Sequence, residues 1–288
     1  MTYHKDSFLE AKPKLLKVAY NMLGSLSEAE DIVQEAWLRW NKTNSDEVES
    51  SQAYLMTIVT RLCLDYMQSA RNQREVYSGP WLPEPIIDLQ GQPGPDQLNE
   101  LAETLSYGLL ALLEKLSPSE RAVFILRKAF DFRHGEIAEV LSITEDNARQ
   151  LDRRAKLRLN QADTRFETNR EQHEQLLREF VLACANGDLS ALSNMLSEQV
   201  TAYSDGGGKV SALLRPISGR DRVVNYLKRV SLLAQQNRAI QLCRINGQLG
   251  VASIEEGAIV NALTISITNG KIDVIYNVRN PDKLGAVI

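Results

Sequence analysis

The 288-residue sequence is poor in the residues that build disulfides and metal sites. It contains three histidines and three cysteines (Cys63, Cys184 and Cys243), and no two cysteines stand at the spacing of metal ligands. Widely separated cysteines argue against a disulfide framework and favour a reducing compartment, which predicts a cytoplasmic protein. We therefore expect no metal site and no cofactor.

Long hydrophobic runs and a basic surplus are also missing. No apolar stretch approaches the roughly 20 residues that a membrane-spanning helix needs, and charged residues interrupt the N-terminal segment, so we expect neither a membrane span nor a signal peptide. The net charge of −4 argues against a free-standing nucleic-acid-binding protein. Basic residues nevertheless gather in one segment, at Arg149, Arg153, Arg154, Lys156, Arg158 and Arg165.

That segment closes a pattern typical of a helix-turn-helix. Ser117-Pro118-Ser119-Glu120 predicts a capped helix that runs to about Phe130, because serine, proline and glutamate occupy the positions of a capping box. A short helix follows over residues 136–141, and Thr144 is a plausible cap for a last helix. The last helix has an apolar stripe and a polar face, which would enter a major groove; a solvated basic helix is the alternative. We expect Asp152 on this helix to pair with a neighbouring arginine.

The N-terminal 78 residues predict three helices. Gly24 ends the first, Ser27-Glu28-Ala29-Glu30 reads as a capping box for the second, and the third has an apolar stripe between residues 55 and 66. Residues 79–97 are rich in proline and glycine and form a linker. This linker contains Trp81-Leu82-Pro83-Glu84-Pro85, and its apolar residues predict that it docks on a surface. From Leu98 another leucine-rich helix leads into the helix-turn-helix.

After about residue 166 the pattern changes to α+β. Two helices are expected over residues 170–185 and 188–197, and a third over residues 220–236. The predicted strands span residues 200–203, 209–214, 240–245, 249–254, 258–268 and 271–278. Asn246-Gly247 and Asn269-Gly270 are hairpin dipeptides. This order suggests a curved sheet around helices, with a hollow on its concave side that could hold a small ligand.

The pieces together resemble the extracytoplasmic-function sigma factors. Residues 29–38 (AEDIVQEAWL) resemble their second region, and residues 116–159 resemble their fourth region. Residues 77–85, 205–209 and 280–284 are similar to three signatures of a subgroup in which a SnoaL-like, NTF2-like cone is fused behind the sigma core. The resemblance implies a multidomain chain: region two over 1–78, the linker over 79–97, region four over 98–165 and the cone over 166–288.

The same resemblance implies an alternative sigma factor, not an enzyme, that directs RNA polymerase core to specific promoters. It would bind the clamp of the β′ subunit through Asp31, Gln34, Glu35 and Arg39, and region four would meet the β flap. It would contact the −10 element through Arg61, Asp65 and Arg71. It would contact the −35 element through Asn147, Arg149, Gln150, Arg153 and Arg154. Taken without the resemblance, the polar face at 31–39 is more typical of a solvated helix.

The resemblance also implies that the cone regulates the sigma core in cis. The residues implied are Trp81, Pro83, Glu84, Asp205, Gly206, Gly207, Gly208, Lys209, Asn280, Asp282 and Lys283. A hairpin turn alone could explain the glycines. Two other functions remain open on the sequence: a ligand-sensing helix-turn-helix regulator, and a SnoaL-like enzyme domain fused to a DNA-binding module. The second has little acid–base chemistry to use, because the chain has no histidine after His173.

Overall fold

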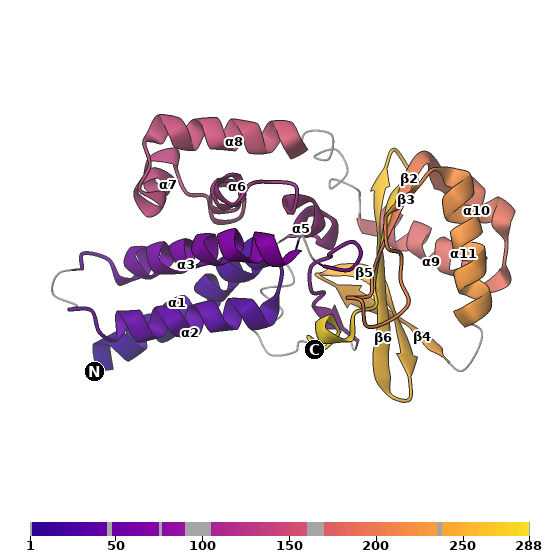
Figure 1. Ribbon diagram of the computed structural model, residues 1–288, viewed down its shortest axis with the longest axis horizontal. Helices are drawn as coiled ribbons and strands as arrows, with labels where there is room; N and C mark the ends of the chain where they lie inside the picture. Colours follow the sequence, from indigo (N-terminus) through magenta and orange to yellow (C-terminus); the bar gives the residue numbers. More distant parts are fainter. Residues whose placement is uncertain are drawn as a thin grey trace. The chain divides into compact units, whose positions relative to one another are not determined.

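The structure is a computed structural model that describes residues 2–44, 48–74, 77–89, 105–159, 170–234 and 238–287. Its helices and strands fall into two compact units (Figure 1). The first unit contains residues up to 76 and most of 99–160, and the second contains residues 77–98, 106–109 and 161–288. No helix in the described part of the chain is long and apolar enough to cross a membrane.

The first unit begins with three helices: α1 (Thr2–Leu23), α2 (Leu26–Trp40) and α3 (Ser51–Arg74). Gly24 ends α1 in the left-handed conformation, with φ of 72°, as the sequence predicts. The predicted capping box of α2 is wrong by two residues. Ser25 is the N-cap and its side chain accepts from the amide of Glu28, because Ser25-Leu26-Ser27-Glu28 offers the same serine–glutamate spacing one half-turn earlier.

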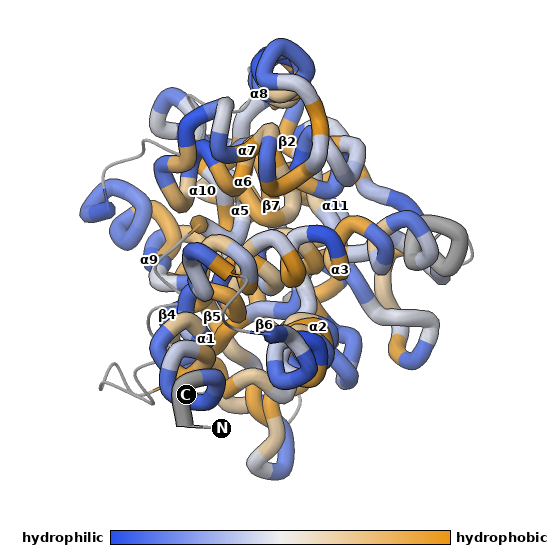
Figure 2. The backbone as a smooth tube through the Cα atoms, turned by 90° about the vertical axis from the view of Figure 1, so that its left-hand side faces the viewer, coloured by the Kyte–Doolittle hydropathy of each residue, from blue (hydrophilic) through white to orange (hydrophobic). Residues whose placement is uncertain are grey.

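The helix-turn-helix is confirmed. It consists of α6 (Pro118–Phe130), α7 (His134–Leu141) and α8 (Glu145–Leu159). Ser117 and Glu120 form the predicted capping box, and Thr144 accepts from the amide of Asn147 at 3.2 Å. Such a cap is typically worth about 1 kcal/mol. Figure 2 shows α8 as largely hydrophilic, with short hydrophobic stretches between its polar turns.

One side chain joins α6 to α1 inside the first unit. Arg121 is 1% exposed, and its guanidinium donates twice to the carbonyl oxygen of Asn21, at 3.1 and 3.2 Å. Glu114 accepts a further hydrogen bond from the same guanidinium and balances its charge. The two helical segments of the sequence therefore pack on each other within one unit. Of the leucine-rich helix predicted from Leu98, only the part from residue 105 is described, and it contains α5 (Tyr107–Leu113).

The second unit is α+β, as predicted. Its helices are α9 (Arg170–Asn186), α10 (Leu189–Met195) and α11 (Arg220–Ala234). Its strands are β1 (Ile87–Asp88), β2 (Leu196–Asp205), β3 (Ile217–Ser218), β4 (Ala239–Ile245), β5 (Gln248–Glu255), β6 (Ala258–Thr268) and β7 (Lys271–Val278). Among the described residues these form one sheet in the order β1-β4-β5-β6-β7-β2-β3. Only the β2–β7 pair is parallel within that sheet.

The helices cover one face of this sheet (Figure 1). A hydrophobic core fills the space between them; it includes Leu177, Phe180, Val223, Leu227, Val251, Ile265 and Ile275. The two predicted hairpin dipeptides are confirmed, because Asn246-Gly247 and Asn269-Gly270 both have positive φ at each residue. The sheet therefore packs one of its faces on the helices of the second unit.

One predicted strand and the end of one predicted helix are wrong. Residues 209–214 form no strand, although they alternate, because no neighbouring strand is there to pair with them and Val210 and Leu214 are left exposed. The predicted helix over 188–197 ends at Met195, and β2 begins at Leu196. The sequence did not predict β1, in which two linker residues add to the sheet edge: Ile87 lies opposite Ile245, and Asp88 lies opposite Arg244.

Candidate functional site

The candidate polymerase-binding residues lie on one face of α2. Asp31, Gln34 and Arg39 are exposed and Glu35 is half-exposed, while Ile32, Val33 and Ala36 on the other face are buried. The 3.6-residue period of the helix produces this separation. Glu35 Oε1 accepts from Nε of Arg39 at 2.8 Å, one turn further along. The face therefore presents a paired charge beside Asp31 and Gln34.

The candidate −10 residues lie on α3 and are not equally open. Asp65 is exposed, and the side chain of Arg71 lies outside the described residues. Arg61 is also exposed, but its guanidinium is engaged within the first unit. Nε donates to the carbonyl oxygen of Val140 at 3.2 Å, and one terminal nitrogen donates to Oγ of Ser142 at 2.6 Å. Sequence reasoning could not foresee this contact, because about 80 residues separate the partners.

The candidate −35 residues share the outer face of α8. Asn147, Arg149, Gln150, Arg153 and Arg154 are all exposed, while the apolar stripe packs inward through Ala148 and Ala155. Arg149 donates to Glu145 Oε1 at 2.6 Å, one turn earlier. Guanidinium and amide groups of this kind match the hydrogen-bonding edges of guanine and adenine in the major groove.

The predicted arginine partner of Asp152 is wrong. Asp152 is 5% exposed, and its Oδ2 accepts from Nζ of Lys156 at 2.9 Å. Nε2 of His134 on α7 lies 3.1 Å from the same oxygen. The arginines on either side of Asp152 point outward with the polar face, whereas Asp152 points inward toward α7, so the carboxylate joins the two helices of the motif and leaves those arginines open.

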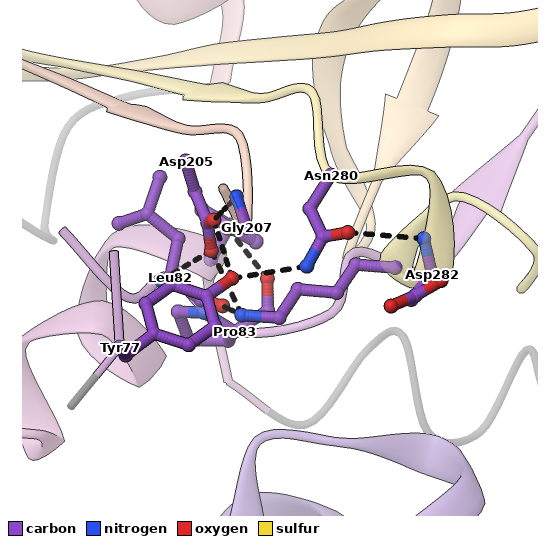
Figure 3. A network of polar contacts seen from close by, with 9 residues as sticks. Tyr77, Leu82, Pro83, Asp205, Gly207, Asn280 and Asp282 are labelled. Atoms are coloured by element: carbon purple, nitrogen blue, oxygen red, sulfur yellow. Dashed lines mark hydrogen bonds and ion pairs between the residues drawn. The ribbon is translucent and has the colours of Figure 1, made fainter. Parts of the chain in front are cut away.

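Asp205 binds the linker in the second unit (Figure 3). This carboxylate is fully buried at the end of β2. Its Oδ1 accepts from the hydroxyl of Tyr77 at 2.6 Å and from the amide of Gly207 at 3.0 Å. Its Oδ2 accepts from the amide of Leu82 at 2.9 Å and from Nζ of Lys283 at 2.8 Å. Four donors thus satisfy a charge that burial would otherwise strongly disfavour.

Lys283 holds the same linker segment from the C-terminal side. Its side chain is 11% exposed, and Nζ also donates to the carbonyl oxygen of Leu82 at 2.6 Å. The ammonium lies 4.0 Å from the ring centroid of Trp81 and 5.0 Å from that of Tyr77. Cation–π contacts of this kind strengthen when they are shielded from water. We call Tyr77, Trp81, Leu82, Asp205, Asn280 and Lys283 the linker lock.

Burial raises the pKa of Tyr77 above its ordinary value, and the hydrogen bond to Asp205 raises it further. Nδ2 of Asn280 donates to the tyrosine oxygen at 2.9 Å, so the hydroxyl is held from both sides. Sequence reasoning placed Tyr77 in a signature but assigned it no role. The signal that could have found it is its position next to the Gly79-Pro80 turn, where a side chain that orients the linker is expected.

The rest of the linker adds backbone contacts. The carbonyl oxygen of Pro83 accepts from the hydroxyl of Tyr107 at 2.7 Å, and Glu84 is buried. Ile86 donates to Oδ1 of Asn246 at 3.2 Å, and its carbonyl oxygen accepts from the amide of Asn246 at 3.0 Å. Adding an extended segment to a sheet edge satisfies its polar backbone. The linker is therefore part of the second unit through residue 89.

The glycine turn at residues 206–208 lets the linker and the C-terminal segment lie close to the end of β2. A Cβ on Gly207 would lie 2.4 Å from Nδ2 of Asn280, and one on Gly208 would lie 3.1 Å from Cβ of Ser78. A Cβ on Gly206 would lie 2.5 Å from the carbonyl oxygen of Val210. Lys209 and Asp282, which the resemblance also implies as regulatory residues, form an exposed ion pair outside the linker lock. Nζ of Lys209 lies 2.7 Å from Oδ1 of Asp282. Exposed pairs of this kind contribute little, roughly 0–1 kcal/mol.

Comparison with known proteins identifies the two helical segments. The model of Sigma-70 region 2 matches residues 8–73, and that of Sigma-70, region 4 matches residues 108–159. Along nearly its whole length the chain is also 33% identical to the ECF RNA polymerase sigma factor SigJ of Mycobacterium tuberculosis, covering 96% of this chain and 92% of SigJ. The chain belongs to the extracytoplasmic-function sigma factors.

A second relative and a solved structure support the same family assignment. The probable ECF RNA polymerase sigma factor SigI of M. tuberculosis is 30% identical, over 94% of this chain and 91% of SigI. The crystal structure of M. tuberculosis SigJ superposes with a TM-score of 0.77 at 30% identity, covering 98% of both chains. The predicted fold class is thereby confirmed for two all-α sigma regions followed by an α+β region. As an alternative sigma factor the protein works with RNA polymerase core and promoter DNA.

Proposed function

We propose that this sigma factor is controlled in cis by its C-terminal unit, which acts by holding the linker between regions two and four. The observation that carries the proposal is the linker lock. Asp205 and Lys283 are buried in the C-terminal unit, and both bind the backbone of Leu82 in the linker. Because the linker connects the two promoter-recognition regions along the chain, a held linker has less reach than a free one.

The contacts with RNA polymerase and with the promoter belong to the same proposal. The face of α2 binds the β′ clamp through Asp31, Gln34, Glu35 and Arg39, a mixed polar stripe that suits a basic helix on a protein partner. Arg61, Asp65 and Arg71 serve the −10 element, where cations bind phosphate as strands separate. The outer face of α8 reads the −35 element through Asn147, Arg149, Gln150, Arg153 and Arg154. Region four also meets the β flap.

The energetics support a lock that can be released. The buried ion pair is not by itself a large source of stability, because desolvation offsets much of its Coulomb energy. Removing one partner, however, leaves an uncompensated buried charge and typically costs about 3–5 kcal/mol. Within the lock, the hydroxyl of Tyr77 and the backbone of Leu82 complete the bonding of Asp205. Linker binding is thus coupled to the integrity of a few side chains.

No catalytic step is assigned to the C-terminal unit. Its His173 is 4% exposed, with Nε2 lying 3.1 Å from the carbonyl oxygen of Ile265, and burial lowers its pKa. A small ligand that binds the C-terminal unit, and acts in the cytoplasm on the lock, belongs to the same proposal. Such a ligand would act by favouring either the locked or the released linker.

Transcription in vitro with purified core polymerase tests the proposal. The full-length chain is compared with Asp205→Ala, and with Asp221→Ala as the matched control, since Asp221 is exposed in the first turn of α11. We expect Asp205→Ala to change promoter-specific transcription at least several-fold while the control does not. Equal transcription from all three chains, with the linker of Asp205→Ala demonstrably released, would show that the lock does not regulate.

A further inference from the structure

Arg61 joins region two to the turn of the helix-turn-helix. Its guanidinium bonds the carbonyl oxygen of Val140 at 3.2 Å and Oγ of Ser142 at 2.6 Å. Val140 lies in the last turn of α7, where unpaired carbonyl oxygens and the helix dipole favour a cation. Ser142 is the C-cap and has a φ of 53°, which presents its hydroxyl beyond the end of the helix. The two helices α3 and α7 belong to the same unit (Figure 1).

A second contact between the regions is buried. Arg121 of region four bonds the carbonyl oxygen of Asn21 in region two. Asn21 is fully buried, and among the described residues neither atom of its side-chain amide has a hydrogen-bond partner. An unsatisfied buried amide carries a desolvation penalty that water would relieve. Specific polar contacts thus hold the two regions together, but the side-chain amide of Asn21 beside them makes no hydrogen bond within the described part of the chain. This weakens the contact, as is expected of a contact that must open.

Promoter geometry requires it to open. Elements centred at −10 and −35 are about 25 base pairs apart, or roughly 85 Å along B-form DNA. In the first unit a −10 candidate touches the turn that precedes the −35 helix, with 2.6 Å between Arg61 and Ser142. One compact unit cannot occupy both elements at that separation. The bonds to Val140 and Ser142 use two of the five N–H groups of Arg61 and fix its guanidinium on the α7–α8 turn, so the side chain cannot move to a DNA phosphate elsewhere without leaving that turn.

We propose that Arg61 is a latch that keeps the sigma regions closed in the free protein, by using on the α7–α8 turn the same guanidinium that serves the −10 element. The inference rests on the proposed −10 role of Arg61. Core polymerase releases the latch because it binds the two regions apart. The free protein therefore binds promoter DNA weakly. Binding to core polymerase and separation of the two sigma regions then occur in a single step.

Single-molecule fluorescence transfer within the full chain tests the latch. Dyes are placed at Gln52→Cys on α3 and Glu139→Cys on α7, both exposed, in a Cys184→Ser background, since Cys63 and Cys243 are buried. We expect one high-transfer population in the free protein and a low-transfer population after core is added. The variants are Ser142→Ala and Arg61→Ala. The matched control is Ser69→Ala, which removes an exposed hydroxyl bonded to Tyr66 on α3.

Both latch variants should raise the low-transfer fraction of the free protein, Ser142→Ala by about tenfold, because it removes a hydrogen bond to a charged group. Ser142→Ala should also bind a −10 single strand more tightly without core, whereas Arg61→Ala should open without that gain. A closed population unchanged in either variant overturns the latch, as does an opened Ser142→Ala chain with unchanged DNA binding. The fluorescence readout needs no DNA, so it stands even if Arg61 proves to have no −10 role.

Discussion

The ammonium of Lys283 lies 4.0 Å from the ring centroid of Trp81 and 2.8 Å from Oδ2 of Asp205. One cation from the C-terminal segment thus meets an aromatic ring of the linker and a carboxylate at the end of β2. A point charge between a π-face and a carboxylate is stabilised by both. Because Lys283 contacts both Trp81 and Asp205, a substitution of Lys283 is the most direct test of the linker lock.

Replacing Lys283 with methionine should release the linker. The substitution preserves an apolar stem of similar length but leaves Asp205 buried without its counter-charge, at a cost of about 3–5 kcal/mol. Amide hydrogen exchange over residues 80–88 measures the release. Lys209→Met is the matched control, because its pair with Asp282 is exposed and contributes roughly 0–1 kcal/mol. Equal protection in the two variants would contradict the assignment of Lys283.

Tyr77 gives the lock a dependence on alkaline pH. Burial and the bond to Asp205 raise its pKa in the folded protein above that of an unfolded tyrosine, about 10. A raised pKa of an acid means that the lock is fully stabilised below pH about 10 and loses that stabilisation as the pH rises toward the folded pKa. Tyr77 should therefore be among the tyrosines that ionise late when all nine are titrated by absorbance. Tyr77→Phe should reduce the amplitude of that late transition by one tyrosine.

Reversing charges on α2 should abolish binding to core polymerase. Asp31→Lys with Glu35→Lys turns an acidic stripe basic, while the buried face of α2 is untouched, so the fold should survive. Co-elution with core polymerase is the measurement, and circular dichroism checks folding. Glu10→Lys on α1 is the control, since it changes an exposed acid away from this face. Co-elution of the folded double variant with core would show that α2 is not the binding face.

Arginines on α8 should separate into readers and holders of DNA. An arginine that reads a base should lose about 1–3 kcal/mol of discrimination at one position when changed to alanine. An arginine on phosphate should weaken all sequences and flatten the salt dependence. Arg149→Ala and Arg153→Ala are compared with Arg178→Ala, an exposed arginine on α9, by competition binding of holoenzyme to promoter variants. No change at any base pair would mean that another face of region four reads the −35 element.

Local rules predicted the local features. Ser117-Pro118 and Thr144 begin helices as predicted, because a helix cap depends only on the few residues around it. The Asn-Gly dipeptides form turns as predicted, because such a turn depends only on the φ values of its own two residues. Long-range pairing was beyond such rules. The strand β1, the latch on Arg61 and the partners of Asp152 each join residues that only the folded chain brings together. The resemblance already implied Asn280 and the glycines at 206–208, but the close approach of Gly207 to Asn280 could be seen only in the structure.

Removing residues 285–288 should loosen the linker without unfolding the C-terminal unit. The carbonyl oxygen of Ala286 accepts from the amide of Ile87 at 2.9 Å, and Val287 forms a bridge with Ile87. The truncation therefore takes the tail partner from β1 but leaves Asp205 and Lys283 in place. We expect faster exchange of the Ile87 amide and a change in transcription in the same direction as, but smaller than, that of Lys283→Met. A chain truncated after Leu284 in which that amide stays fully protected would show that β4 alone holds the linker at this edge.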